Sequence, residues 1–170
     1  MGGYDHPASR LLALVDAPEH VCCRYRIRAF EPALADAGCT ITYQAIRRGL
    51  VARSIQLSQA SRYDAVILQR KLLSRWQTAI LARSARRLIF DFDDAVLHRD
   101  SYDPLGVESP RLARRFAAIV KAADTIIAGN DFLADCALRA GASAHSVRTI
   151  PTCVNPALYP SKGEPRGGSS

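Results

Sequence analysis

Short apolar segments alternate with longer, more polar ones along most of this chain, at intervals of about twenty-five residues. The apolar segments are residues 11–15, 39–44, 65–69, 88–92, 124–128 and 147–150. Runs of this length, rich in β-branched residues, are typical of strands that are buried on both faces. Because strands that alternate with helices join by right-handed crossovers, the sequence predicts a Rossmann-like α/β fold with one doubly wound parallel sheet.

Two of the intervening helices have clear start signals. Ser109 can cap the first and Pro110 suits its first turn, so a helix is predicted over 109–122, covering one face of the sheet. Asn130 can cap the second, and Gly141 suits the left-handed position after its end.

The other helical patterns are weaker. Residues 25–37 have an apolar face, but Pro32 lies inside the pattern, so the helix is either kinked there or begins only near residue 31. Residues 51–60 and 74–86 are rich in Arg, Ser and Gln, and we expect them to form helices at the periphery of the sheet.

A length of 170 residues, 48% of them apolar, suits one domain. We expect this domain to span residues 1–160, and the polar residues 161–170 to be a disordered tail or a severed interdomain linker. The sequence has neither the run of about 18 apolar residues that a membrane span needs nor a signal peptide, so a cytoplasmic location is predicted.

The net charge of +7 is concentrated in residues 47–87, where ten Lys or Arg residues accompany one acid, Asp64. Such a segment attracts phosphorylated substrates, anionic lipid headgroups or nucleic acid, and it is equally typical of solvated helix faces. No nucleic-acid-binding motif accompanies it, so we expect no nucleic acid partner. The basic segment also allows the protein to lie peripherally on the inner face of a membrane.

The five cysteines lack the paired spacing of a zinc site, so no metal is predicted and a reducing compartment fits best. Cys22 and Cys23 fall in a predicted loop beside Arg24 and Arg26, where nearby cations would lower the pKa of a thiol.

The sequence FDFDDAV, residues 90–96, ends a predicted strand with three carboxylates. In a parallel sheet, ligands gather at the carboxyl ends of strands. We therefore assign Asp93 and Asp94 as candidate catalytic residues, acting as a general base or as acceptors for a substrate hydroxyl. For Asp91, the residue still within the strand, we expect a structural pairing with a strand-end arginine.

The same string is similar to the DxDx[TV] nucleophile motif of haloacid-dehalogenase-like phosphatases. Ala95 stands at the Thr or Val position, however, and no acidic pair for magnesium follows the motif. A phosphatase is therefore the third choice.

Polar residues at two other strand ends are candidate substrate-binding groups. Gln69, Arg70 and Lys71 follow the third predicted strand, where a cationic pair beside carboxylates can hold phosphate or sugar hydroxyls. Arg24 and Arg26 follow the first. No GxGxxG or P-loop sequence is present, so no dinucleotide cofactor is expected.

Five segments in order, residues 22–38, 63–73, 86–96, 123–137 and 150–160, resemble the N-terminal domain of family 4 glycosyltransferases. The most specific are FDFDDAV and IPTCVNPALYP. This resemblance implies one half of a GT-B architecture, in which two Rossmann-like domains face a cleft. The first domain binds the acceptor and the second binds a nucleotide sugar.

The resemblance also implies transfer with retention of anomeric configuration, without a cofactor or an obligatory metal. The acceptor would be a glycan, a lipid-linked sugar or a small molecule. Arg24 would lie in the loop that contacts the acceptor, and Asn130 at a helix start facing the cleft. Asp93 and Asp94 would occupy the strand end where many relatives have an acceptor-site histidine.

Two features depart from the family pattern. The glycine-rich first loop of many members is replaced by residues 17–23, and no sugar-nucleotide domain follows residue 170. We therefore expect the chain to be inactive without a donor-binding domain or subunit. The alternative is a non-catalytic module that binds anionic lipid or polysaccharide.

Overall fold

The computed structural model describes residues 9–98 and 108–152. The predicted tail, residues 161–170, lies outside the described residues. Among the residues that are described, no helix is both long and apolar enough to cross a bilayer.

The fold is a Rossmann-like α/β domain built on a six-stranded parallel sheet with strand order β2-β1-β3-β4-β5-β6. The strands are β1 (Ser9–Val15), β2 (Cys39–Ala45), β3 (Ala65–Gln69), β4 (Leu88–Phe92), β5 (Thr125–Ala128) and β6 (Val147–Thr149). Each of them was predicted, with ends that differ by at most two residues. The predicted fold class is therefore confirmed.

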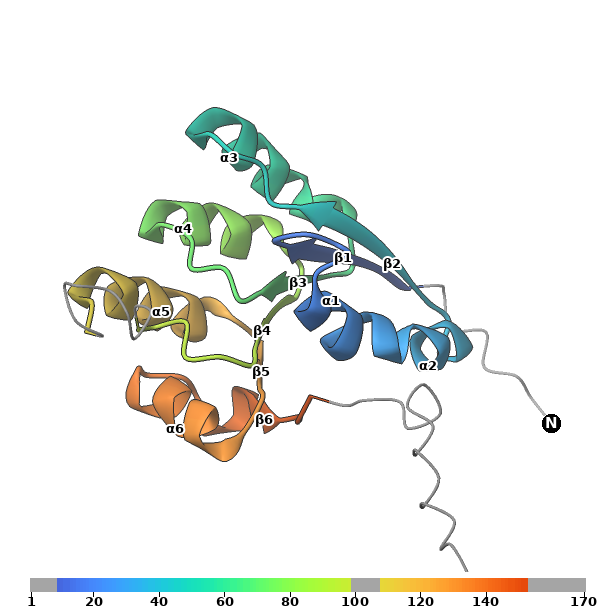
Figure 1. Cartoon of the computed structure of the whole chain (residues 1–170). Helices are drawn as coiled ribbons and strands as arrows, with labels where there is room; N and C mark the ends of the chain where they lie inside the picture. The colour runs from blue at the N-terminus through green and yellow to red at the C-terminus, as the bar shows by residue number, and fades with distance from the viewer. Residues whose placement is uncertain (1–8, 99–107, 153–170) are drawn as a thin grey trace, which may run out of the picture.

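The helices form two unequal layers (Figure 1). The chain moves from β1 to one edge of the sheet, then returns past β1 and proceeds to the other edge. Right-handed crossovers in opposite directions place their helices on opposite faces. One face therefore carries α1 (Val21–Arg26) and α2 (Glu31–Asp36), and the other carries α3 (Leu50–Ser58), α4 (Arg75–Ser84), α5 (Pro110–Ala122) and α6 (Asp131–Arg139).

The two clearest helix predictions are confirmed by their caps. The Ser109 hydroxyl accepts a hydrogen bond from the backbone N–H of Leu112 at 3.3 Å, and the side chain of Asn130 accepts one from Leu133 at 2.9 Å. Gly141 follows α6 with a φ of 99°, a left-handed conformation in which glycine is favoured.

Pro32 lies at the start of a separate helix that begins at Glu31, which was one of the two alternatives predicted from the sequence. It lies in the first turn of α2, where its missing N–H costs little. Helix α1 begins at Val21, so Cys22 and Cys23 are helical and their predicted loop position is wrong. The start of α1 is capped by the His20 ring, which accepts from the Cys22 N–H at 3.3 Å.

Helix α4 corrects another expectation, because it lies between α3 and α5 and not at the periphery (Figure 1). Its first turn is closed by a hydrogen bond from the backbone N–H of Ser74 to the side chain of Gln77 at 3.3 Å. Leu81, in its last turns, is fully buried.

The main core lies between the sheet and the layer of α3 to α6. Its centre is an aromatic group in which Phe116 of α5 packs edge-on against Phe92 at 5.3 Å between ring centroids, and Phe90 stacks on Phe92 at 5.1 Å. Such aromatic pairs add to the hydrophobic gain from burial. A smaller apolar cluster between α1 and the sheet holds Cys23 and Ile27.

We expect Phe116→Ala to lower the free energy of unfolding by about 3 to 5 kcal/mol, because the truncation leaves a cavity against two fixed rings. Urea unfolding followed by circular dichroism measures this. Phe132→Ala is the matched control, since Phe132 is exposed on α6, and it should change stability by less than about 0.5 kcal/mol. Equal effects of the two variants would contradict this description of the core.

Candidate functional site

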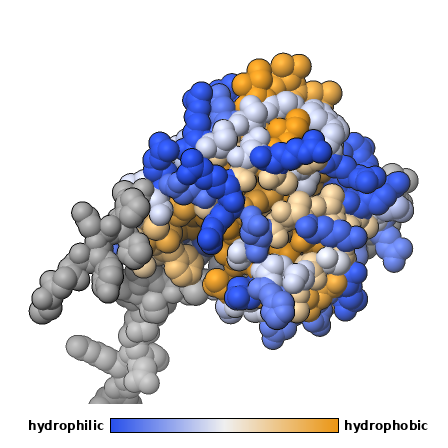
Figure 2. Space-filling view, turned by 180° about the vertical axis from the view of Figure 1, so that it is seen from behind, coloured by the Kyte–Doolittle hydropathy of each residue, from blue (hydrophilic) through white to orange (hydrophobic). Residues whose placement is uncertain are grey.

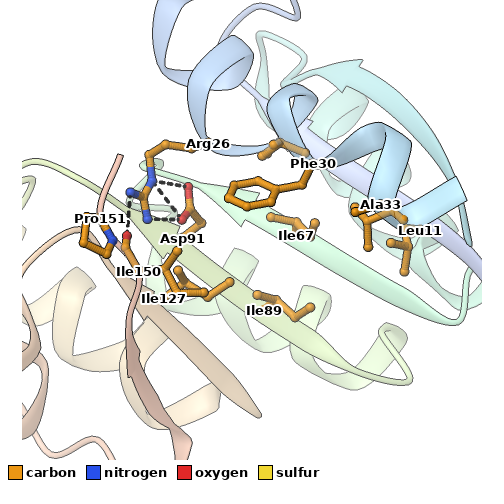
Figure 3. Close-up of a pocket in the computed structure, with 12 residues that line it drawn as sticks. Leu11, Arg26, Phe30, Ala33, Ile67, Ile89, Asp91, Ile127, Ile150 and Pro151 are labelled. Atoms are coloured by element: carbon orange, nitrogen blue, oxygen red, sulfur yellow. Dashed lines mark hydrogen bonds and ion pairs between the residues drawn. The ribbon is translucent and has the colours of Figure 1, made fainter. Parts of the chain in front are cut away.

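A buried ion pair joins α1 to the carboxyl end of β4. The Arg26 guanidinium donates to both carboxylate oxygens of Asp91, at 2.7 to 3.1 Å, and the two side chains are 2% and 3% exposed. Gln69 donates to the same carboxylate at 3.0 Å. The Nη1 atom of Arg26 donates to the carbonyl of Ile150 at 3.0 Å (Figure 3). It also donates to the Thr152 hydroxyl at 3.3 Å. The pair therefore ties α1, β3, β4 and the segment after β6 together.

Burial raises the pKa of Asp91, while the hydrogen bonds and charge of Arg26 and the hydrogen bond from Gln69 oppose that rise. Asp91 thus pairs with an arginine as expected, although this arginine comes from a helix. The guanidinium of Arg26 and the amide of Gln69 both have protein acceptors. These contacts favour structural roles for Arg26 and Gln69, and the substrate contacts assigned to them stay predictions.

The ion pair closes one end of an apolar cavity of about 310 Å³ (Figure 3). Ile67, Ile89 and Ile127, from three neighbouring strands, form its floor on the face that carries α1 and α2. Phe30 lines the opposite side. The cavity therefore lies between helices α1 and α2 and the sheet, and it extends toward β5.

Arg70 stands at the end of β3 in the left-handed conformation, with a φ of 57°. It is the one non-glycine residue with positive φ among those the structure describes, and such strain is often kept at functional sites. Its guanidinium lies 3.0 Å from Asp94 Oδ2 and 3.5 Å from Asp93 Oδ1, and it also contacts Cys22 Sγ. The backbone N–H of Arg70 donates to the Asp91 carbonyl at 2.8 Å, which holds this conformation against β4.

The two candidate catalytic carboxylates have different environments. Asp94 is 67% exposed, and its Oδ1 accepts from the backbone N–H of Ala95 at 2.8 Å, a turn-capping bond. Asp93 is 16% exposed, and its Oδ1 is buried without a hydrogen bond from the part of the chain that the structure describes. A buried carboxylate oxygen without a donor is costly unless a ligand supplies one. Asp93 Oδ1 therefore keeps the capacity to accept a hydrogen bond next to the Arg70 guanidinium.

The pKa values of the cysteines correct the sequence-based expectation. Burial, followed by the charge of Asp93, raises the pKa of Cys22 more than Arg70 lowers it. Burial also raises the pKa of Cys23, which belongs to the apolar cluster under α1. The predicted lowering is wrong, because desolvation outweighs the nearby cations. Neither thiol is therefore activated as a nucleophile.

The other predicted residues follow the carboxyl ends of the strands or lie in the helix after β1. Lys71 Nζ is 2.6 Å from Asp16 Oδ1, and both side chains are partly exposed. Asn130 caps α6 at the end of β5. Arg24 is exposed, with its guanidinium 5.8 Å from the ring centroid of Tyr25. Arg70, Lys71, Asp93, Asp94 and Asn130 therefore follow three neighbouring strands, β3 to β5.

Two residues that shape this site were not predicted from the sequence. Asp16 directly follows β1 and pairs with Lys71, and its strand-end position was the available signal. Gly129 follows β5, and a Cβ atom there would lie 2.9 Å from the Cα of Asp93. A glycine is thus required for the ends of β4 and β5 to approach each other, which periodicity does not reveal.

No group of three or more His, Cys, Asp or Glu side chains within residues 9–98 and 108–152 is arranged to hold a metal ion. No protein-family model and no curated protein sequence matches the chain.

The structure is similar to that of Alr3699/HepE from Anabaena in complex with UDP-glucose, with a TM-score of 0.52 and 16% identity over 89% of this chain. Two other HepE structures also match. The complex with UDP and glucose has a TM-score of 0.48 and 15% identity over 89% of this chain, and the UDP complex has 0.46 and 16% over 88%. The chain spans 45% to 46% of the HepE chains. At this identity the similarity shows the fold alone, a Rossmann-like α/β domain like the matching part of HepE.

We expect Arg26→Leu to lower the free energy of unfolding by about 3 to 5 kcal/mol, since it leaves a buried carboxylate without its cation. Denaturant unfolding measures this. Arg24→Leu, on the exposed face of the same helix, should change stability by less than about 0.5 kcal/mol. The double variant Arg26→Leu/Asp91→Leu should recover most of the loss, because no unpaired charge remains.

The loss in Arg26→Leu should also depend on pH. Without Arg26, the pKa of folded Asp91 rises further above its unfolded value of about 3.9. A raised folded pKa gives stability that is present below the unfolded pKa and is lost as pH rises. The difference between variant and parent should therefore shrink from pH 7 toward about pH 4. A difference that is the same at both pH values would contradict the buried charge as its cause.

Proposed function

We propose that this chain is the acceptor-binding half of a retaining glycosyltransferase, which transfers a sugar from a nucleotide sugar to a glycan, lipid-linked or small-molecule acceptor. The observation that carries the proposal is the buried Oδ1 of Asp93 at a strand end, which accepts no hydrogen bond from the described residues and lies 3.5 Å from Arg70 Nε. A hydroxyl group of a ligand can donate a hydrogen bond to such an oxygen. The fold similarity to HepE, whose solved structure holds UDP-glucose, supports the same class.

The chemistry assigned to Asp93 is that of a proton acceptor. The acceptor hydroxyl donates to Oδ1, and its oxygen bonds to the anomeric carbon on the same face from which the nucleotide departs, as retention requires, while the bond from that carbon to the nucleotide breaks. The hydroxyl proton then passes to the carboxylate, and the nucleotide leaves with the bonding electron pair. Arg70 and Lys71 supply positive charge at this edge for a phosphate on either substrate. Retention of configuration rests on the family resemblance.

In this proposal the donor is bound by a separate half, as the family resemblance implies. Sugar transfer needs both reactants held in near-attack geometry, an effect of about 7 to 11 kcal/mol, and one wall of a cleft does not provide it. The donor-binding half would be a further domain or a partner subunit. The cytoplasmic location predicted from the sequence belongs to the same proposal.

The structure disfavours the phosphatase alternative. Its two motif carboxylates would be Asp91 and Asp93. Asp91 is enclosed by Arg26 and Gln69 with its side chain 3% exposed, so it has no path to a phosphate. A covalent mechanism at this position would require breaking the ion pair that fixes α1.

We expect the purified chain to bind its acceptor class weakly through Asp93. Saturation-transfer NMR against a panel of monosaccharides, oligosaccharides and sugar phosphates should find a ligand with a Kd of about a millimolar. Asp93→Asn should weaken binding by about tenfold or more, because the amide keeps an acceptor oxygen but loses the charge that strengthens the hydrogen bond. Asp135→Asn, an exposed carboxylate on α6, is the matched control.

The second measurement is sugar-transfer activity, assayed with this chain joined to its donor-binding half. Asp93→Asn should reduce kcat/KM by about a hundredfold or more, and Asp94→Asn by about tenfold through loss of its pairing with Arg70. A loss below about threefold in Asp93→Asn would assign that residue to structure. Acceptor binding that is unchanged by the Asp93→Asn substitution would contradict the proposal in the same way.

A further inference from the structure

Helix α3 presents three aliphatic side chains to solvent, one at its first residue and two on its outer side. Leu50, Val51 and Ile55 are 65%, 75% and 53% exposed. Val51 and Ile55 lie on the outer side of the helix, whereas Leu57, nearly opposite Ile55, is fully buried, and Leu50 is exposed because it is the first residue of the helix. Figure 2 shows these apolar atoms at the upper margin of the molecule, over α3, among hydrophilic ones. Clustered exposed aliphatic side chains mark a contact surface.

Arginines surround these aliphatic residues. Arg47 and Arg48 are exposed just before α3, and Arg53 within the helix donates to the Arg47 carbonyl at 2.8 Å. The side chain of Gln56 fixes this entry, accepting from the Arg47 N–H at 2.9 Å and donating to the Ala45 carbonyl at 2.9 Å. We name Arg47, Arg48, Leu50, Val51, Arg53 and Ile55 the α3 surface.

Helix α5 extends this positive charge. Burial lowers the pKa of Arg115, and the nearby cations Arg111 and Arg53 lower it further. Arg53 of α3 therefore lies close enough to Arg115 of α5 for their charges to repel each other. Asp64, the acid in the basic segment, pairs with Arg86 at the amino ends of strands β3 and β4. Glu108, before α5, is the described acid nearest to Arg111 in sequence.

We propose that the α3 surface docks onto a bilayer that contains anionic lipid. Leu50 and Val51 enter the interface between headgroups and acyl chains, and the arginines contact lipid phosphates. A bilayer uses both parts of the surface, since amphipathic helices bind it through buried apolar area together with attraction to anionic headgroups. Nucleic acid and polyanionic glycans use the cations but gain nothing from exposed aliphatic side chains. Trp76, exposed in the first turn of α4, has the side chain type favoured at that interface.

The docked orientation has a consequence for the substrate. Helices α3, α4 and α5 begin at the edge where the strands end, and Arg115 donates to the carbonyl of Leu72, in the loop that carries Arg70. Docking would bring Arg70 and Asp93 toward the bilayer, so the acceptor would be lipid-linked. This consequence rests on the proposed function, whereas the docking itself does not.

Vesicle flotation with the purified chain tests the docking. We expect binding to vesicles of equal parts phosphatidylglycerol and phosphatidylcholine, and little to pure phosphatidylcholine. Raising the salt from about 0.05 M to about 0.5 M should weaken binding about tenfold or more by screening the arginines. Binding that is absent, or unchanged by salt, would overturn the proposal.

Substitutions then separate the two components of the surface. Leu50→Gln/Val51→Gln should weaken vesicle binding by about tenfold, and Arg48→Gln by about fivefold. The matched controls, Leu138→Gln on α6 and Arg83→Gln in the last turn of α4, should bind within about twofold of the parent. Circular dichroism confirms that each variant is folded.

Two outcomes would overturn the assignment. Equal losses in the controls would show that binding is not localised to α3. Vesicle binding that falls with Arg48→Gln but not with Leu50→Gln/Val51→Gln, together with equally tight binding to heparin or DNA, would identify a polyanion site. Neither outcome bears on Asp93, so failure here is distinguishable from failure of the proposed function.

Discussion

The Arg26–Asp91 ion pair is the interaction on which the geometry of the candidate site depends. The two residues are 65 positions apart in sequence, and both side chains are almost fully buried. A buried charge is tolerated only with its partner, so the pair permits one position of α1 over the sheet. That position places Cys22 against Arg70, which in turn contacts Asp93 and Asp94. The same guanidinium holds Ile150, so the exit of β6 is fixed by the same residue.

The three carboxylates at the end of β4 therefore differ in burial and in hydrogen bonding. Asp91 is enclosed and paired, Asp93 is mostly buried with one oxygen free of hydrogen bonds from the described residues, and Asp94 is exposed and caps a turn. Alternation along an extended strand points Asp91 and Asp93 to the same side, so Asp93 extends the row that Asp91 begins. The ion pair beneath is a rigid support, and the strained Arg70 closes the side toward β3.

Sequence periodicity was sufficient for the sheet and for the caps at Ser109 and Asn130, because strand burial and helix capping are local properties. The start of α1 was missed, since a histidine ring at His20 caps it and histidine is not a usual cap residue. The roles of strand-end side chains were harder to predict. Whether Arg26 faces substrate or Asp91 depends on how a helix from one end of the chain lies on a strand from its middle. The pKa of Cys22 likewise depends on burial, which its cationic neighbours in sequence do not reveal.

Calorimetric titration of the purified chain with UDP-glucose, the ligand held by the similar HepE structure, tests the central claim that these residues form the acceptor side and not the donor side. Nucleotide sugars are normally held by glycine-rich turns and helix N-termini that compensate the diphosphate. The described turns after β1, β3, β4 and β5 contain one glycine, Gly129, and it is used for the close approach to Asp93. We predict no binding tighter than about a millimolar. Micromolar binding would place the donor site within this chain and contradict its assignment as the acceptor half.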